Sequence, residues 1–200
     1  ELLKKDLPQD VKDGILKSKE EFPNPDEIIS EFEQQGFKFI KRKTIIDYLI
    51  NNAPPLTKGI NDCSYEDFNK ALSVGVTAPF YLSKLFLPYL NDNATIINIS
   101  SSRDRMSQPQ TESYTASKGA ISALTHALAI SLSHKVRVNS ISPGWINTSN
   151  TSITDELDHL QHPSGRIGKP IDIYRCVKWL IEDEFTTGQV ISPNGGLVIT

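Results

Sequence analysis

The sequence predicts an α/β domain with a doubly wound parallel sheet and helices on both faces. From about residue 44 onward, short apolar runs alternate with long helical patterns, and connections of this kind imply right-handed crossovers between parallel strands. The expected strands are continuous apolar runs, which is typical of strands covered on both faces. Asn-Asn, Ser-Ser and Pro-Gly pairs follow the first three strands, at the edge where ligands of such sheets bind.

The elements follow from periodicity and from turn residues. Apolar positions at helical spacing predict helices at residues 65–90, 113–133 and 171–183. Apolar runs bounded by polar or turn residues predict strands at residues 45–50, 95–100, 137–142 and 188–193. We expect residues 1–200 to form one domain, with 44–200 as its core. Residues 1–43 form a divergent amino-terminal segment, in which a helix and then a short strand at 37–40 are expected.

Composition excludes several classes of protein. The 200 residues carry a formal net charge of −3 without a long basic run, so nothing favours nucleic acid or an anionic membrane surface. No stretch approaches the roughly 18–20 continuous apolar residues of a membrane span, and the first residues lack the apolar core of a signal peptide. Cys63 and Cys176 are far apart and are expected to be reduced thiols. The histidines show no metal-ligand spacing. We therefore expect a cytoplasmic protein without a metal site.

The candidate chemistry lies in Tyr114 and Lys118. Residues four apart share one face of a helix, so the Lys118 ammonium can lie near the Tyr114 hydroxyl. A nearby positive charge favours the deprotonated form of a tyrosine, which suits it for general acid–base catalysis. Ser101 ends the preceding strand, where its hydroxyl could hold a carbonyl or alcohol oxygen beside the tyrosine.

Taken alone, a tyrosine four residues before a lysine is weak evidence, because such pairs are usually found on the surface of a helix. The flanking segments change that assessment. INISS precedes the pair, ASKGAISALTHALA contains its lysine and continues the helix, and RVNSISPGWINT comes next along the chain.

Together these segments resemble the short-chain dehydrogenase/reductase family, whose fold is Rossmann-like. The resemblance runs from about Ile46 to the C-terminus. DYLINNAP is similar to the family's strand ending in Asn-Asn-Ala-Gly, with Pro54 in place of the glycine. SPGWINT resembles the family's Pro-Gly segment. GRIGKPIDI and TTGQVISPNGG resemble its C-terminal stretch, with Asn194 where an aspartate is usual.

The resemblance implies hydride transfer between a nicotinamide cofactor and a carbonyl/alcohol pair. It assigns proton exchange with the substrate oxygen to Tyr114, binding of the nicotinamide ribose and activation of the tyrosine to Lys118, and orientation of the substrate to Ser101. The cofactor-binding residues that it implies are Asn51, Ala53, Tyr114, Lys118, Pro143, Gly144, Ile146 and Thr148.

The first departure from the family pattern is at the amino end. The family places a glycine-rich turn after its first strand, where the pyrophosphate meets a helix N-terminus. Before residue 50 this chain has only Gly14 and Gly36. The basic residues at 41–43 (Lys41, Arg42 and Lys43) would favour the 2′-phosphate of NADP if they follow the family's second strand, although a solvated basic turn is the more common origin of such a run. The expected cofactor is therefore NAD or NADP, with a lean to NADP.

The second departure is Gly75, which stands where the family often uses an asparagine to hold a proton-relay water. A glycine inside a helix costs about 0.5–1 kcal/mol relative to alanine, so a packing or bending reason is expected. Three readings stay open. The chain is an oxidoreductase, a non-catalytic binding or regulatory scaffold, or an incomplete form of an ordinary enzyme.

Partners are also implied by the resemblance. Residues 149–166 occupy the family's variable substrate loop, and His159 and His162 could face one pocket there, although solvated loop histidines are more common. The substrate is expected to be a small carbonyl or alcohol compound. We expect a homodimer or homotetramer that pairs the two long helices, unless the small-residue ridge on the second packs only on its own sheet. That ridge consists of Ala116, Ala120, Ala123 and Ala127.

Overall fold

A computed structural model describes residues 46–149 and 155–198. The chain divides into two units, Glu1–Thr44 and Ile45–Thr200, and the described residues all belong to the second. The predictions for residues 1–43, including the basic run at 41–43, lie outside the described residues. The single-domain assignment therefore stays a prediction.

The described sheet has four parallel strands in the order β1 (Ile46–Asn51), β2 (Leu90–Ile99), β3 (Val136–Ile141) and β4 (Val190–Ile191). This confirms the predicted doubly wound architecture. The last strand is shorter than the predicted 188–193, because Gly188 has a φ of 72° and Pro193 has no N–H for the ladder.

The first predicted long helix is continuous from Tyr65 to Tyr89, but it is not uniform. It consists of α3 (Tyr65–Leu72), the π-helical segment η2 (Ser73–Thr77), α4 (Ala78–Phe86) and the 3₁₀ segment η3 (Leu87–Tyr89). The other described helices are η4 (Ser102–Asp104), α5 (Glu112–Ser131), α6 (Glu156–Leu160) and α7 (Pro170–Glu182). A π-helical turn inside an α-helix often marks a functional position, and here it contains Gly75.

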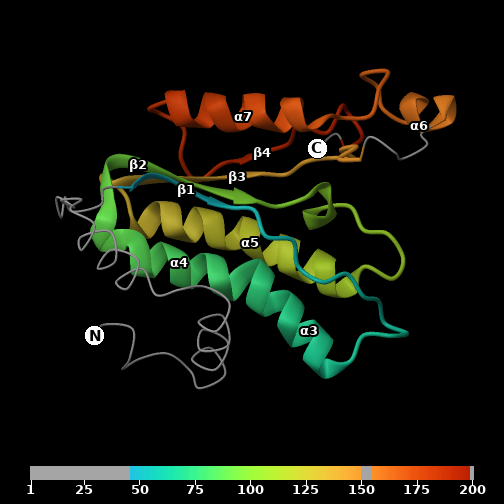
Figure 1. Cartoon of the computed structure of the whole chain (residues 1–200), viewed down its shortest axis with the longest axis horizontal. Helices are drawn as coiled ribbons and strands as arrows, with labels where there is room; N and C mark the ends of the chain where they lie inside the picture. The colour runs from blue at the N-terminus through green and yellow to red at the C-terminus, as the bar shows by residue number, and fades with distance from the viewer. Residues whose placement is uncertain (1–45, 150–154, 199–200) are drawn as a thin grey trace, which may run out of the picture. The chain divides into compact units, whose positions relative to one another are not determined.

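The helices form layers on the two faces of the sheet (Figure 1). α4 and α5 cover one face and α7 the other. Side chains at alternating positions of β2 point to opposite faces, so Ile96 belongs to the core beneath α5 and Ile97 to the core beneath α7. Strand β1 departs from the expectation of burial on both faces, since Tyr48 and Ile50 are about half exposed, at 52% and 43%.

The helix Tyr65–Tyr89 meets the length and hydropathy criteria of a membrane span, and 22% of its most apolar window is buried. The sequence-based expectation concerned a continuous apolar run and did not include this helix, whose apolar residues are interrupted by polar ones. Length and composition do not separate a span from a helix that packs on a sheet or on a second subunit. In this structure α4 packs on β1 and β2.

Candidate active site

The predicted site residues that follow strands meet at one edge of the sheet. Asn51 ends β1, Ser101 lies just after β2, and Pro143 lies just after β3. The loops after β2 and β3 are joined directly, because the Ser102 N–H donates to the Pro143 carbonyl at 2.8 Å. The carboxyl ends of parallel strands therefore bring these segments together, as expected from the topology.

Lys118 of α5 reaches the same edge. Its side chain is buried, and its ammonium donates to the Ile99 carbonyl at 2.6 Å, two residues before Ser101. The ammonium also lies 5.4 Å from the centroid of the Tyr114 ring. Burial lowers the pKa of Lys118 to about 8. The lysine therefore stands between the tyrosine and the strand end that leads to the serine.

Ser101 is held by its own turn. Its backbone is extended and caps η4, and its Oγ accepts a hydrogen bond from the Arg103 N–H at 3.2 Å. With this lone pair engaged, the hydroxyl proton of Ser101 is free to donate to an incoming oxygen.

A buried carboxylate that sequence reasoning missed ties this turn to its surroundings. The Asp104 side chain is 3% exposed. It accepts from the Ser122 hydroxyl of α5 at 2.8 Å and from the Ser142 hydroxyl after β3 at 3.3 Å. Ser100 adds a hydrogen bond to the Lys118 carbonyl at 2.9 Å. The sequence gives no local signal for this burial, because the two serines that donate to Asp104 come from separate elements.

Asn51 is positioned by a second buried polar chain. Its Nδ2 donates to the Oδ1 of Asn98, its register partner on β2, at 2.8 Å. Asn98 in turn donates to the Thr125 hydroxyl of α5 at 3.0 Å. Because Asn98 and Thr125 are fully buried, this chain fixes the end of β1 relative to α5. Asn98 was not singled out from the sequence, where it looks like an interruption of an apolar strand.

A cavity of about 650 Å³ opens beside Ser101. The predicted residues Gly144 and Ile146 line it as well, whereas Tyr114 and Lys118 are not among its lining residues. Its wall consists of Ser101, Ser102, Arg103, Met106, Ser107, Gln108, Gly144, Trp145, Ile146, Gln161 and Leu197. Two predicted cofactor residues lie outside this arrangement, since Ala53 and Thr148 are exposed and neither lines the cavity.

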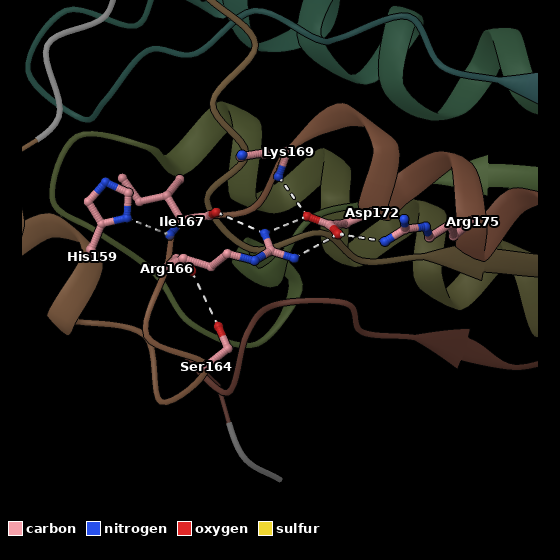
Figure 2. Close-up of polar contacts among 7 residues, drawn as sticks. All are labelled: His159, Ser164, Arg166, Ile167, Lys169, Asp172 and Arg175. Atoms are coloured by element: carbon pink, nitrogen blue, oxygen red, sulfur yellow. Dashed lines mark hydrogen bonds and ion pairs between the residues drawn. The ribbon is translucent and has the colours of Figure 1, made fainter.

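A cluster of polar contacts at the start of α7 (Figure 2) flanks Gly168, the residue that bridges to Ile146 of the cavity wall. Arg166 donates through both terminal guanidinium nitrogens to Asp172, at 2.7 and 2.8 Å, and the Lys169 N–H donates to the same carboxylate at 2.8 Å. Arg166, followed by the Lys169 N–H, lowers the pKa of Asp172 to about 2. Between these residues, Gly168 forms a parallel bridge with Ile146.

Two candidate histidines lie near this cluster, but the structure does not support a shared pocket for them. His162 is 2% exposed and its ring stands 6.2 Å from the ring of Trp145. His159 accepts a hydrogen bond from the Ile167 N–H at 3.3 Å. Neither lines the cavity. The expectation of solvated loop histidines is also wrong for His162, because α6 and the following turn pack it beneath Trp145.

A parallel α/β sheet with polar residues gathered at its carboxyl edge defines a Rossmann-like fold. A family model described as enoyl-(acyl carrier protein) reductase matches residues 31–198. The chain belongs to the short-chain dehydrogenase/reductase family.

Relatives and solved structures agree with this assignment. The chain is 38% identical over 187 residues to an uncharacterized oxidoreductase of Thermotoga maritima, covering 84% of this chain and 73% of the relative. It is similar to an apo SCOR enzyme from Clostridium thermocellum, with 43% identity and a TM-score of 0.72, over 78% of this chain and 65% of that one. An angucycline C-6 ketoreductase with bound NADP gives 28% identity and a TM-score of 0.69, over 76% of this chain and 63% of that one. The chain thus spans about two thirds of these structures.

The described residues fit the nicotinamide half of such a cofactor. A Cβ on Gly144 would stand 2.8 Å from the Cα of Asn194, so only glycine lets this backbone pack there while it lines the cavity. The buried Lys118 ammonium spends one N–H on Ile99 and has two more for ribose hydroxyls. The glycine-rich turn for the pyrophosphate has no counterpart within residues 46–149 and 155–198.

Proposed function

We propose that this chain catalyses hydride transfer between a nicotinamide dinucleotide and a small carbonyl/alcohol substrate. The observation that carries the proposal is the position of the Lys118 ammonium, buried between the Tyr114 ring and the strand end that leads to Ser101. Burying an amine without a carboxylate partner is costly. Such a buried cation is expected where it takes part in a reaction. It therefore supports the activity that family membership suggests.

The protein's own residues handle the proton and the substrate oxygen. The bound dinucleotide supplies or accepts the hydride. In the reducing direction, Tyr114 donates its hydroxyl proton to the carbonyl oxygen. Ser101, whose Oγ accepts from the Arg103 N–H, donates its own hydroxyl proton in a hydrogen bond to the same oxygen. The Lys118 ammonium stabilises the tyrosinate that remains and binds the ribose.

The alternative is a non-catalytic scaffold. Gly75 favours it, because a glycine replaces the asparagine that often holds a proton-relay water in the family. This glycine has a packing role against Ser117 of α5, so its presence does not require lost catalysis. The lack of a glycine-rich turn also favours the scaffold. It bears on the affinity for the dinucleotide, which a titration measures.

The cofactor is NAD or NADP. Solved relatives bind NADP in one case and NADH in another, so the lean to NADP depends on the basic run at 41–43, which lies outside the described residues. A matched titration with NADH and NADPH, followed by cofactor fluorescence, measures both affinities. Binding of neither at millimolar concentration would remove the oxidoreductase proposal for this chain.

Where a dinucleotide binds, Tyr114→Phe tests the assignment of the proton donor. This variant should abolish turnover and leave the cofactor affinity nearly unchanged, since only one hydroxyl is lost. Tyr174→Phe is the matched control, because Tyr174 lies on α7 and is 58% exposed. Retained turnover in Tyr114→Phe would refute the role of Tyr114.

We also propose a homodimer or homotetramer. The alanines of the ridge on α5 are half-buried or exposed, whereas a different set of α5 residues packs inward, including Ile121, Thr125 and Leu128. The ridge is therefore available to a second helix. The long helix adds exposed apolar residues, namely Phe80, Leu82, Leu85 and Tyr89. Sedimentation equilibrium that shows only monomer would contradict this proposal.

A further inference from the structure

The cavity beside Ser101 has an uneven distribution of polarity. Its lining residues include four apolar ones, Met106, Trp145, Ile146 and Leu197, and two uncharged amide residues, Gln108 and Gln161. Among the described residues, Arg103 is the single charged residue of the wall, and none of the carboxylates lines it. The cavity therefore has an excess positive charge in largely neutral surroundings.

The charge of Arg103 is not neutralised by its neighbours. Its guanidinium makes one hydrogen bond, to the Met106 carbonyl at 3.4 Å, and no ion pair with any described residue. The adjacent Asp104 is engaged elsewhere, with the hydroxyls of Ser122 on α5 and Ser142 after β3 and with the Arg105 Nε at 3.6 Å. Most of the N–H donors of Arg103 are consequently available to a ligand.

We propose that the natural substrate is an oxo or hydroxy compound carrying an anionic oxygen group, a carboxylate or a phosphate, that binds Arg103. This inference rests on the proposed function. The reacting oxygen lies at Ser101, the anion pairs with the guanidinium, and a short carbon chain contacts the apolar wall. A guanidinium binds two oxygens of such a group side by side, and apolar walls strengthen the attraction by excluding water.

The size of the cavity restricts the substrate further. Its volume is about 650 Å³, within the range of small-molecule sites. Gly144 and Ile146 belong to the same wall and are the residues assigned to the nicotinamide. Part of the volume is thus used by the cofactor, which leaves room for a compact substrate.

A binding experiment tests the inference without turnover. The chain has two tryptophans, Trp145 and Trp179, so Trp179→Phe leaves the cavity residue Trp145 as the only one. Its fluorescence is titrated with 3-oxobutanoate and its neutral methyl ester, and with dihydroxyacetone phosphate and dihydroxyacetone. Each titration is done without dinucleotide and with saturating oxidised dinucleotide, which cannot reduce these ketones.

The variants in this background are Arg103→Gln, Arg103→Lys and the control Arg175→Gln, whose side chain is 72% exposed on α7. Arg103→Gln should weaken binding of the preferred anion by about 10–100-fold, as expected when charge-assisted hydrogen bonds are lost. The affinity of Arg103→Lys for the anion should lie between those of the unsubstituted background and Arg103→Gln, because lysine keeps the charge and loses the paired geometry. Binding of the neutral partner should change by less than about twofold, as should all binding in Arg175→Gln.

The outcomes separate this inference from the proposed function. Anion binding that depends on Arg103, in a chain that reduces no carbonyl compound, supports the site and removes the oxidoreductase proposal. Turnover with equal preference for the anionic and neutral partners, unchanged in Arg103→Gln, overturns the inference and leaves the oxidoreductase standing. The two anion series show whether a carboxylate or a phosphate is preferred, and no binding of either anion also overturns the inference.

Discussion

Gly75 of η2 packs directly against Ser117 of α5, so closely that a Cβ on Gly75 would stand 2.8 Å from the Ser117 Cβ and 2.9 Å from its Oγ. Ser117 immediately precedes Lys118, and its hydroxyl donates to the Tyr114 carbonyl at 2.8 Å. The π-helical turn and the turn of α5 that carries Tyr114 and Lys118 are thus in contact through a position that has no room for a side chain.

Gly75→Ala should therefore destabilise the protein, although alanine is the better helix former. Overpacking a buried contact costs about 1–3 kcal/mol, which exceeds the gain of about 0.5–1 kcal/mol in helix propensity. Gly119→Ala is the matched control, since a methyl group there would have no described atom within 4 Å outside its own helical turn, and it should be neutral or stabilising. Urea unfolding measures both, and equal effects of the two changes would contradict the packing role of Gly75.

Lys118 should make stability rise with pH. Its pKa in the folded chain is about 8, against an ordinary value of 10.5, so between these values the unfolded chain holds the proton that the folded chain has released. Stability must then increase as pH rises through 8. From pH 7 to pH 9.5 the gain is about 2 kcal/mol. It is measured as the difference in unfolding free energy between the wild type and Lys118→Met, and a difference that stays constant with pH would exclude this burial effect.

Asp104 should matter to both stability and turnover. Asp104→Ala removes the acceptor of the Ser122 and Ser142 hydroxyls, and loss of such buried, charge-assisted bonds costs about 2–4 kcal/mol. The turn that carries Ser101 then loses its link to α5, so kcat should fall as well. Asp104→Asn keeps one acceptor oxygen and should recover part of both losses. Asp92→Ala, at an exposed position, should have little effect on either quantity.

The pair formed by Arg166 and Asp172 should give a stabilisation that acid removes. The pKa of Asp172 is held at about 2, below its ordinary value of 3.8, so its contribution is complete above pH 3.8 and is lost as pH falls toward 2. The melting temperature of the wild type should exceed that of Asp172→Asn at pH 6, and the difference should shrink by pH 2.5. Glu182→Gln, which removes an exposed partner of Lys178, controls for general charge effects. A difference that does not shrink in acid would contradict the ion pair.

The order of strands and helices in the core could be predicted because each element has a pattern of its own. TIINIS (95–100), for example, is an apolar run that ends in a serine, and its first five residues form the carboxyl half of β2. The spacing of Tyr114 and Lys118 likewise fixed their common helix face. The π-helical turn could not be predicted, because SVGVT has no local signal for it and the turn accompanies a contact with a helix about forty residues further on.

Asp104, Asn98 and Arg103 show what local pattern cannot reveal. Asp104 in a polar turn looks solvated, and its burial depends on Ser122 and Ser142 arriving from separate elements. Asn98 is explained only by the register that sets it opposite Asn51. The role proposed for Arg103 depends on a wall built by four separate segments of the chain, whose described residues include no carboxylate.

The bridge between Ile146 and Gly168 links the cavity wall to a residue that does not line the cavity. A methyl group on Gly168 would stand 2.3 Å from the Cδ1 of Ile146 and 3.1 Å from the Trp145 carbonyl oxygen. Because Cδ1 is the flexible end of the Ile146 side chain, a larger residue at 168 displaces that end rather than requiring a smaller residue at 146. The identity of residue 168 therefore affects the shape of the cavity through Ile146.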